Sequence, residues 1–405
     1  MSYSNGDWDI WPSDNMDFWK LTDVSNTITI TWSKNCFIDY KKLSYDFYDC
    51  GYEVFTECIE RDPCGTKSDM WFLTGIFLLR QSIELGLKAL LCRVVHNKDS
   101  ISRIFKEHCH NLSMLFNRYI TLSSERFLTS GESDWLEQYL SAVEYVDEKS
   151  DMFRFPFDNG FLQQYRDEFL DTAAIANNLV QAFTLVKKCI EKGVVATDCE
   201  FDSSYSSEFL ILANQGFGNC YLWQPISDDG FHVKVKGYMD VSEHIFHTPN
   251  VHLKSKVYPL IFMLRNTVEL ALKRVFYKNL DYGVSEKAFN SKRKSHLIKK
   301  DLWKNVKPIL IQYAQAQNQD LSIIETVEHM LFVIDTLDKK GDTFRYPTSY
   351  GLQYRLADMT LDLKNVYEYF RAIINFLNGC DCMFDAISEY ETDMRSEYQD
   401  YYSCY

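Results

Sequence analysis

The stretch LRQSIELGLK at residues 79–88 decides the fold expected for this chain, because it recurs as LRNTVELALK at residues 264–273. The two stretches are identical at six of ten positions and similar at the other four. Each places Arg, Glu and Lys four residues apart, which aligns these side chains in one row along a helix. Apolar residues flank the row on both sides, so we expect a long helix inside a helical bundle.

Two further blocks repeat in the same order along the chain. His110 opens HNLSMLF, which parallels HLIKKDLW from His296. Farther on, DEKSDMFRFP from Asp147 parallels DKKGDTFRYP from Asp338. Three blocks in the same order and with similar spacing indicate an internal duplication. We therefore predict two copies that pack together about a pseudo-twofold axis, as the subunits of a homodimer would.

The duplication divides the 405 residues into three parts. Residues 1–200 form the first copy, residues 201–380 the second, and residues 381–405 an acidic, tyrosine-rich tail. We expect the tail to be solvated or to contact a partner. A small β element is expected before the helices of each copy, because apolar and polar residues alternate in 26–32 and in 231–238.

The remaining expected elements are helices, so the predicted fold class is mainly α. Sixteen Gly and eight Pro are few for this length, which argues against a β-sandwich or propeller with many tight turns. Each copy has a long helix with the charged row, a helix after the repeated His, an amphipathic helix and a final helix. The expected bounds are 70–95, 132–147 and 160–192 in the first copy and 257–280, 321–338 and 352–377 in the second, with the final helices stopped by Gly193 and Gly379.

The chain is acidic, with a formal net charge of −14 and a pI of about 5.2. Such a surface argues against general binding of nucleic acid, which needs clustered Lys and Arg, but it leaves room for one basic pocket. The N-terminus does not look like a signal peptide, and no run of about 18 uncharged apolar residues is present. We expect a cytoplasmic protein with no membrane contact, whose twelve cysteines are reduced.

The charged row is the first candidate site. Buried charges are stable only when paired, so Arg80–Glu84 and Arg265–Glu269 are expected to form hydrogen-bonded ion pairs. Two interpretations remain open: a structural pair that orients the helix, or a site that faces an anion or RNA. The Arg of each Phe-Arg-aromatic-Pro segment would either bridge helices or point at a ligand. The predicted ligand-binding residues are Arg80, Glu84, Lys88 and Arg154 in the first copy and Arg265, Glu269, Lys273 and Arg345 in the second.

The histidines form a second set of candidates. His110 and His296 recur in both copies, where each serves either as a capping or packing group or as a general acid and base. His244, His247 and His252 have a spacing that could ligate zinc, but no Cys or acidic residues complete a familiar set. We therefore predict no metal, with these three as weak candidates. The chain has no glycine-rich phosphate loop and no nucleophile elbow. We also predict no cofactor.

The repeated residues resemble the HEPN superfamily. The resemblance rests on Leu-Arg-x3-Glu-Leu-x-Leu-Lys, a helix start after His, and Phe-Arg-Phe/Tyr-Pro, and it covers about residues 40–192 and 245–378. HEPN domains are small helical bundles often found in prokaryotic toxin–antitoxin, abortive-infection and other defence proteins. Ribonuclease members carry Arg-x(4–6)-His; after Arg80 and Arg265 the polar residue of that motif is present, but its His is missing.

This resemblance implies a cytosolic prokaryotic interaction or sensing component of an antiphage-defence or toxin-type system. The expected partner is another protein of the same system or a nucleotide-like ligand, bound between the two copies. RNA is a further candidate ligand, and a homo-oligomer a candidate assembly. The alternative is a metal-independent HEPN-type ribonuclease with a non-standard Arg, Glu and His site, in which His110 and His296 are the candidate catalytic residues. A purely structural scaffold is the third interpretation.

Overall fold

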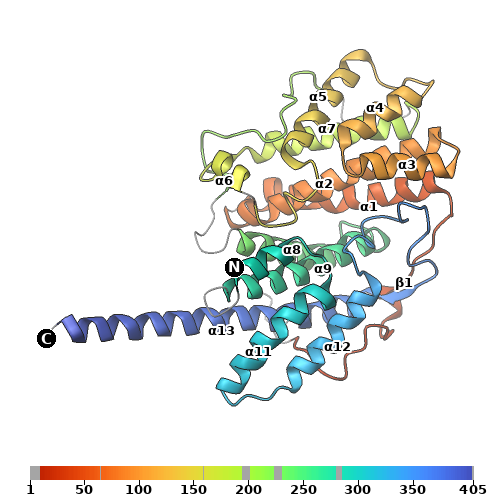
Figure 1. Cartoon of the computed structure of the whole chain (residues 1–405). Coiled ribbons are helices and arrows are strands. Elements are labelled where there is room, and N and C mark those ends of the chain that lie inside the picture. Colours follow the sequence, from red (N-terminus) through yellow and green to blue (C-terminus); the bar gives the residue numbers. More distant parts are fainter. Residues whose placement is uncertain are drawn as a thin grey trace. The chain divides into compact units, whose positions relative to one another are not determined.

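The computed structural model describes residues 10–63, 65–157, 159–193, 201–222, 230–279 and 285–403 (Figure 1). Thirteen α-helices and a few short strands lie in these ranges, so the predicted mainly α fold is confirmed. The helices divide into two compact units. The larger unit is Leu21–Asn266 with Gly341–Leu363, and the smaller unit is Met1–Lys20, Thr267–Lys340 and Lys364–Tyr405. The domain boundaries expected near residues 200 and 380 stay predictions.

The larger unit is built around helix α2 (Gly65–Val94), which confirms the long helix expected over 70–95. The residues from Ile76 to Leu91 are buried on every side of the helix, as expected for a helix inside a bundle. Helix α2 packs against α1 (Cys36–Thr56), α4 (Leu112–Leu122), α7 (Thr172–Ile190) and α8 (Phe231–His247). The unit also holds α3 (Lys98–His108), α5 (Ser130–Asp147), α6 (Asn159–Tyr165) and the first part of α9 (Leu253–Lys278).

Short antiparallel strand pairs connect distant segments of the larger unit. β1 (Thr27–Thr29) pairs with β4 (Thr360–Asp362), with Ile28 opposite Leu361. β2 (Phe169–Leu170) pairs with β3 (Cys220–Tyr221). The strand expected in 26–32 is therefore confirmed in its central residues.

The predicted strand at 231–238 is wrong, because this segment begins helix α8. Phe231 and Tyr238 are seven residues apart, which places both on one buried face of a helix. A short alternating run fits this helical face as well as a strand, and packing decides between them. Gly237 lets α8 lie close to α2, since a Cβ on it would come within 2.5 Å of the carbonyl oxygen of Met70.

The single helix expected over 160–192 is also wrong. Residues 166–171 separate α6 from α7, and β2 lies within this break. Asp171 caps α7, where its side chain accepts a hydrogen bond from the N–H of Ala174 at 2.9 Å. The break depends on pairing with β3, a distant segment, so the local sequence pattern does not reveal it.

Helix α13 (Leu363–Ser403) begins later than predicted and does not end at Gly379. Leu356 and Asp358 have φ values of 53° and 61°, which are incompatible with a right-handed helix. Gly379 lies within the helix because the ring of Trp11 packs against it, 3.1 Å from where a Cβ would lie. The C-terminal tail, predicted to be solvated or to contact a partner, continues α13 through Ser403, and most of its side chains from residue 385 to residue 399 are exposed.

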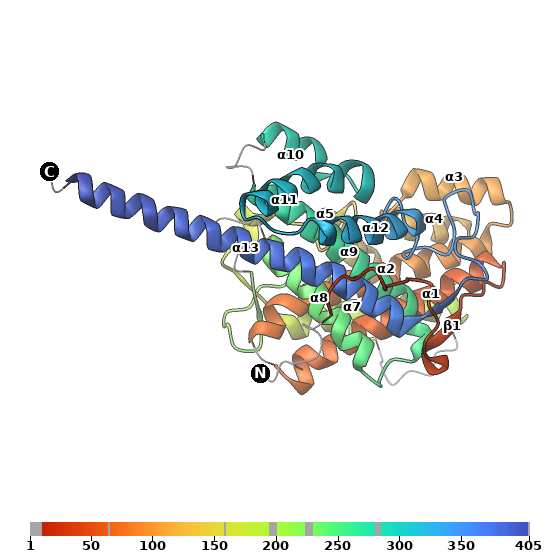
Figure 2. The same cartoon turned by 90° about the horizontal axis from the view of Figure 1, so that it is seen from below.

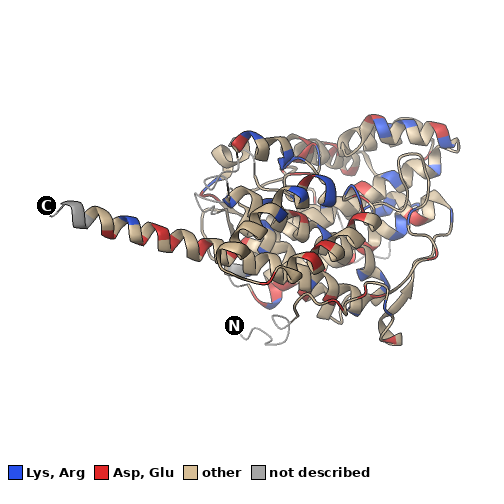
Figure 3. Cartoon of the chain, turned by 60° about the horizontal axis from the view of Figure 1, so that its bottom comes forward, with Lys and Arg blue, Asp and Glu red and all other residues tan. Residues whose placement is uncertain are grey.

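The smaller unit contains the second part of α9, α10 (Glu286–Arg293), the π-helix η4 (Ile298–Trp303), α11 (Lys304–Ala316), α12 (Ser322–Leu337) and most of α13 (Figures 1 and 2). The helices expected over 257–280 and 321–338 are confirmed, apart from residue 280, which lies outside the described residues. Helix α13 continues past the other helices of this unit, and acidic residues mark the projecting part (Figure 3).

Two further expectations concern the cysteines and the membrane. Cys36 of α1 and Cys92 of α2 form a disulfide, so the expectation of reduced cysteines is wrong for this pair. Within the described ranges, every helix is too short or too polar to span a bilayer.

Candidate functional site: two buried Glu–His–Lys clusters

Glu84 of α2 is the centre of a hydrogen-bond cluster in the larger unit and has no exposed surface. Its Oε2 accepts a hydrogen bond from Arg80. Its Oε1 accepts hydrogen bonds from Nζ of Lys88 and from the hydroxyl of Tyr346, each at 2.7 Å. Nδ1 of His110 lies 3.1 Å from the same oxygen. The predicted Arg80–Glu84 ion pair is therefore confirmed, and it is fully buried.

Arg80 also contacts a second carboxylate and a backbone carbonyl. Its Nε lies 3.2 Å from Oδ2 of Asp147, and its Nη2 donates to the carbonyl oxygen of His110 at 2.6 Å. Asp147 also accepts hydrogen bonds from the N–H groups of Asp151 at 2.8 Å and Met152 at 2.9 Å. The guanidinium thereby joins α2 to the end of α5 and to the turn that precedes α4.

Burial and pairing set the protonation states in this cluster. Burial alone would raise the pKa of Glu84, but the charges around it, Lys88 first among them, hold that pKa well below its usual range. Burial lowers the pKa of His110 to about 4, so the imidazole is neutral near pH 7. Because an ionised carboxylate can only accept hydrogen bonds, Nδ1 of His110 carries the proton and Nε2 does not.

A cluster of the same composition surrounds Glu269 in the smaller unit. Oε1 of this buried carboxylate accepts a hydrogen bond from Nζ of Lys273 at 2.7 Å. Nδ1 of His296 lies 2.9 Å from the same oxygen. Both histidines keep part of their side-chain surface, 22% for His110 and 35% for His296. Equivalent residues of the repeated blocks thus make equivalent contacts in the two units.

His110 does not cap the helix that follows it. Asn111 is the N-cap of α4, and its side chain accepts a hydrogen bond from the N–H of Met114 at 2.7 Å. Of the two structural roles expected for His110, the contacts with Glu84 and Tyr346 fit packing rather than capping.

Each Phe-Arg-aromatic-Pro segment contacts one of the two similar stretches: residues 344–347 contact 79–88, and residues 153–156 contact 264–273. Nη2 of Arg345 donates to Oε1 of Gln81 at 2.7 Å and to the hydroxyl of Ser150 at 3.0 Å. The side-chain Nε2 of Gln81 donates to the backbone carbonyl oxygen of Arg345 at 3.4 Å. The side-chain Nδ2 of Asn266 donates to the backbone carbonyl oxygen of Arg154 at 3.3 Å. Gln81 and Asn266 hold the same position in the block, so the two backbone contacts are reciprocal.

Two phenylalanines repeat this reciprocal pattern within the larger unit. The guanidinium of Arg345 lies 5.6 Å from the ring centre of Phe77, and that of Arg154 lies 5.5 Å from that of Phe262. The two rings stack on each other with their centres 5.0 Å apart. Contacts of this kind, i with j and j with i, are those that a twofold relation between two copies produces.

The predicted ligand-binding residues are all buried: Arg80, Glu84, Lys88, Arg154, Arg265, Glu269, Lys273 and Arg345. Arg80, Glu84, Lys88 and Arg345 come together in the larger unit, with Arg345 reaching the cluster through its neighbour Tyr346. Arg265 lies in the larger unit and Glu269 in the smaller one, so their predicted pair stays a prediction. The role of these residues in ligand binding also stays a prediction.

Three further residues belong to these contacts and are absent from the predicted site residues. Tyr346, Gln81 and Asp147 contact Glu84, Arg345 and Arg80 respectively. All three lie within the repeated blocks, which is the signal that could have identified them.

The histidines proposed as weak metal ligands do not form a metal site. Nε2 of His244 lies 3.1 Å from Oε1 of Glu53, which also accepts a hydrogen bond from Thr248 at 2.8 Å. In the part of the chain that the structure describes, no group of three or more His, Cys, Asp and Glu side chains could hold a metal ion. His244, His247 and His252 are therefore not brought together as a zinc site.

Comparison with known proteins identifies no relative of this chain: no family model, no curated protein and no solved structure matches it. The resemblance to the HEPN superfamily therefore depends on the repeated blocks alone.

Proposed function

We propose that this chain is a duplicated, HEPN-like helical protein that serves in the prokaryotic cytosol as a binding component of a defence or toxin-type system. In this proposal it has no catalytic activity of its own. The observation that carries the proposal is the environment of Glu84, which is buried and contacted by Arg80, Lys88, Tyr346 and His110. Groups that act on a substrate must reach it, whereas these charges neutralise one another inside the unit.

The reciprocal contacts support the duplication on which this proposal depends. Phe77 and Phe262 are equivalent residues that touch each other, and Arg154 and Arg345 each lie against the Phe of the opposite copy. These contacts occupy the centre of the proposed pseudo-twofold arrangement with packed side chains. We therefore propose that a partner binds to an outer surface and not between the two charged rows.

A protein is the partner that the overall charge favours. At a net charge of −14, long-range electrostatics oppose the approach of RNA or DNA. A protein partner needs only a complementary surface patch, which an acidic protein can provide.

A ribonuclease is the second candidate, and the position of the two histidines is the observation that favours it. His110 and His296 are each held at Nδ1 by a buried Glu, and each is partly exposed. A carboxylate that accepts from Nδ1 orients the imidazole and leaves the proton-accepting lone pair on Nε2, as a general base requires.

An RNA-cleavage assay of the full chain separates the two candidates. Purified protein is incubated with total RNA and tRNA without divalent metal, beside the double variant His110→Ala/His296→Ala. We expect the RNA to remain intact in both reactions. Cleavage by the wild type that falls about 10²–10⁴-fold in the double variant would establish the ribonuclease instead.

A further inference from the structure

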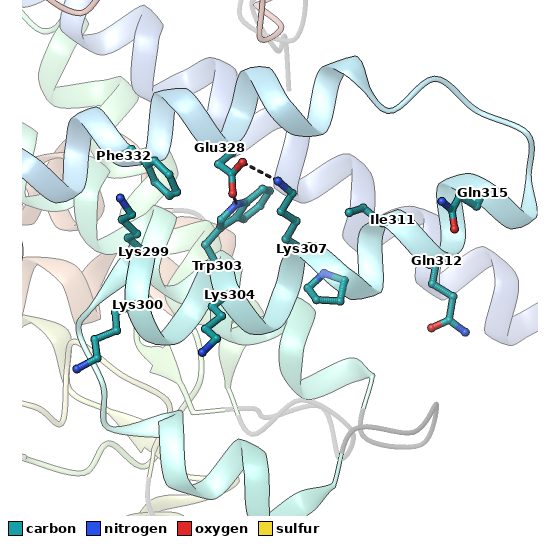
Figure 4. Close-up of a pocket in the computed structure, with 11 residues that line it drawn as sticks. Lys299, Lys300, Trp303, Lys304, Lys307, Ile311, Gln312, Gln315, Glu328 and Phe332 are labelled. Carbon is teal, nitrogen blue, oxygen red and sulfur yellow. Dashed lines mark hydrogen bonds and ion pairs between the residues drawn. The ribbon is translucent and has the colours of Figure 1, made fainter.

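A lysine-rich groove lies on the surface of the smaller unit. It has a volume of about 680 Å³ and follows η4 and α11 beside α12 (Figure 4). Apolar surface of Pro308, Ile311 and Phe332 contributes to its floor, whereas Trp303 lies buried beneath it. Its lysines are Lys299, Lys300, Lys304 and Lys307.

Contacts of α12 with η4 and α11 fix the walls of this groove. Nζ of Lys307 pairs with Oε2 of Glu328 at 2.6 Å, and the indole N–H of Trp303 donates to Oε1 of the same carboxylate at 3.0 Å. Glu328 is therefore neutralised within the wall. Lys300 and Lys304 are exposed, and their side chains extend in the same general direction (Figure 4).

The groove belongs to a basic stretch of an acidic chain. Residues 286–307 contain eight Lys or Arg residues against two acidic ones, although the whole chain has a net charge of −14. Basic charge concentrated in this way attracts an anionic partner, and an apolar floor requires that this partner also carry apolar groups.

The C-terminal part of α13 has this chemistry. Residues 386–403 contain five acidic residues and one Arg. Glu389, Asp393 and Glu397 are exposed and spaced by four, so they form one row along the helix. Tyr390 stands next to this row.

A second row of the same helix is apolar. Tyr390, Met394 and Tyr398 are also spaced by four and lie beside the acidic row. Tyr390 is 66% exposed and Tyr398 60% exposed, which is unusual for such large side chains. The helix thus presents acidic and aromatic rows side by side, as the lysines and the apolar floor of the groove require.

The lengths of helix and groove also agree. At the α-helical rise, residues 386–403 extend over about 26 Å, and residues 299–315, which include much of the groove lining, extend over about 24 Å. The helix does not reach the groove of its own chain, because it runs straight past α11 and α12 (Figures 1 and 2). Phe384 anchors the preceding part of α13 on α11, where its ring lies 4.7 Å from the ring of Tyr313, measured between centres. No Gly or Pro follows Gly379 that could bend the helix back toward the groove.

We propose that two copies of this chain form a dimer in which the C-terminal helix of each copy lies in the lysine-rich groove of the other. The acidic row of the helix meets Lys300 and Lys304, and the tyrosine row covers the apolar floor. Each groove is then occupied by the helix of the other copy. The assembly is therefore closed, with twofold symmetry, and leaves no groove or helix available for a third copy. This inference goes beyond the proposed function and does not depend on it.

Charge-reversal variants of the full chain test this dimer by sedimentation equilibrium at about 0.1 M salt. We expect Lys300→Glu/Lys304→Glu and Glu389→Lys/Asp393→Lys each to raise the dimer dissociation constant at least about tenfold. The chain with all four substitutions should return to within about threefold of the wild type, because each reversed pair again has opposite charges. Lys98→Glu/Lys106→Glu on the exposed face of α3 makes the same change in net charge as Lys300→Glu/Lys304→Glu and should leave the constant unchanged.

Other outcomes overturn the proposal. A wild-type chain that stays monomeric, or a dimer that neither double variant weakens, excludes this mode of assembly. The competing occupant is a single-stranded polynucleotide, tested by fluorescence anisotropy with a labelled oligouridine. Binding that is lost in Lys300→Glu/Lys304→Glu, from a protein that remains monomeric, would assign the groove to nucleic acid. Circular dichroism spectra of all variants control for folding, and Tyr390→Ala/Tyr398→Ala provides a test without any change of charge.

Discussion

The ring of Phe77 stacks on the ring of Phe262, with their centres 5.0 Å apart and their planes inclined by 21°. The two residues precede equivalent Leu-Arg pairs of the repeated block, each by two positions. A residue that touches its own equivalent marks the place where a twofold axis would pass. The contact thus joins the sequence repeat to the packing of the larger unit.

Removal of either ring should therefore cost a similar free energy. We expect Phe77→Ala and Phe262→Ala each to lower the free energy of unfolding by about 3–5 kcal/mol, because both rings are fully buried. The double variant should lose less than the sum, since the two rings are in contact. Urea denaturation of the three variants measures this. A large loss for one ring and none for the other would contradict their equivalence.

The carboxylates of the two clusters should stabilise the fold. We expect Glu84→Ala to lower the free energy of unfolding by about 3–5 kcal/mol, because Arg80 and Lys88 would remain buried without their partner. Glu269→Ala should have a similar effect. Glu137→Ala, at an exposed position of α5, is the control and should change it by less than about 0.5 kcal/mol. Thermal melts that show no loss for Glu84→Ala would mean that the cluster is not structural.

The several N–H donors of the Arg345 guanidinium should contribute to stability as much as its positive charge. In Arg345→Lys, one ammonium cannot replace both Nε, at 3.2 Å from Gln81, and Nη2, which serves Gln81 and Ser150. We expect a loss of about 1–3 kcal/mol in the free energy of unfolding. Arg103→Lys, on the exposed side of α3, should leave it unchanged. Equal stability of the two variants would show that the crossed contact of Arg345 contributes little.

The neutral state of His110 should make the fold sensitive to mild acid. Burial lowers the pKa of His110 to about 4 in the folded chain, against about 6.5 in the unfolded chain. The unfolded state therefore binds the proton first, and stability is lost as the pH falls from about 6.5 to about 4. Glu84, whose pKa is also lowered, loses its contribution only below about 4.3. The full effect of His110 is on the order of 3 kcal/mol.

Denaturation at several pH values checks this effect by comparison of the wild type with His110→Gln. The comparison is needed because burial raises the pKa of Glu144 to about 7, and this carboxyl changes stability in the opposite direction. The wild type should lose more stability than His110→Gln between pH 6.5 and 4.5. His329→Gln, at an exposed position, should follow the wild type. Parallel curves for the wild type and His110→Gln would refute the low pKa.

The sequence predicts the parts of this structure that depend on local pattern. The long helices that carry Glu84 and Glu269 have a strong helical period, and the burial of Arg80 follows from the apolar residues that flank it. The contact of each repeated His with its Glu was not predicted, although the repeat contains both residues. This contact depends on where the turn that carries the histidine lies in space. The spacing of apolar residues along one helix does not contain that information.

The wrong predictions share a physical cause. The strand expected at 231–238 and the helix stop expected at Gly379 were inferred from local preference alone. In both places a distant residue decides the outcome: Met70 lies against Gly237 of α8, and Trp11 lies against Gly379 of α13. Tertiary packing overrides preferences that amount to about 1 kcal/mol per residue.

The central claim is that the buried cluster of Glu84 and His110 holds the fold together and performs no acid–base chemistry. A nuclear magnetic resonance titration of the His110 ring tests it most directly, with the signal assigned by its loss in His110→Gln. If the cluster is structural, the ring stays neutral as the pH falls to about 5, with a pKa of about 4. A general acid or base works best with a pKa near the operating pH. A His110 pKa between about 6 and 7 would therefore refute the structural role of the cluster and favour the ribonuclease.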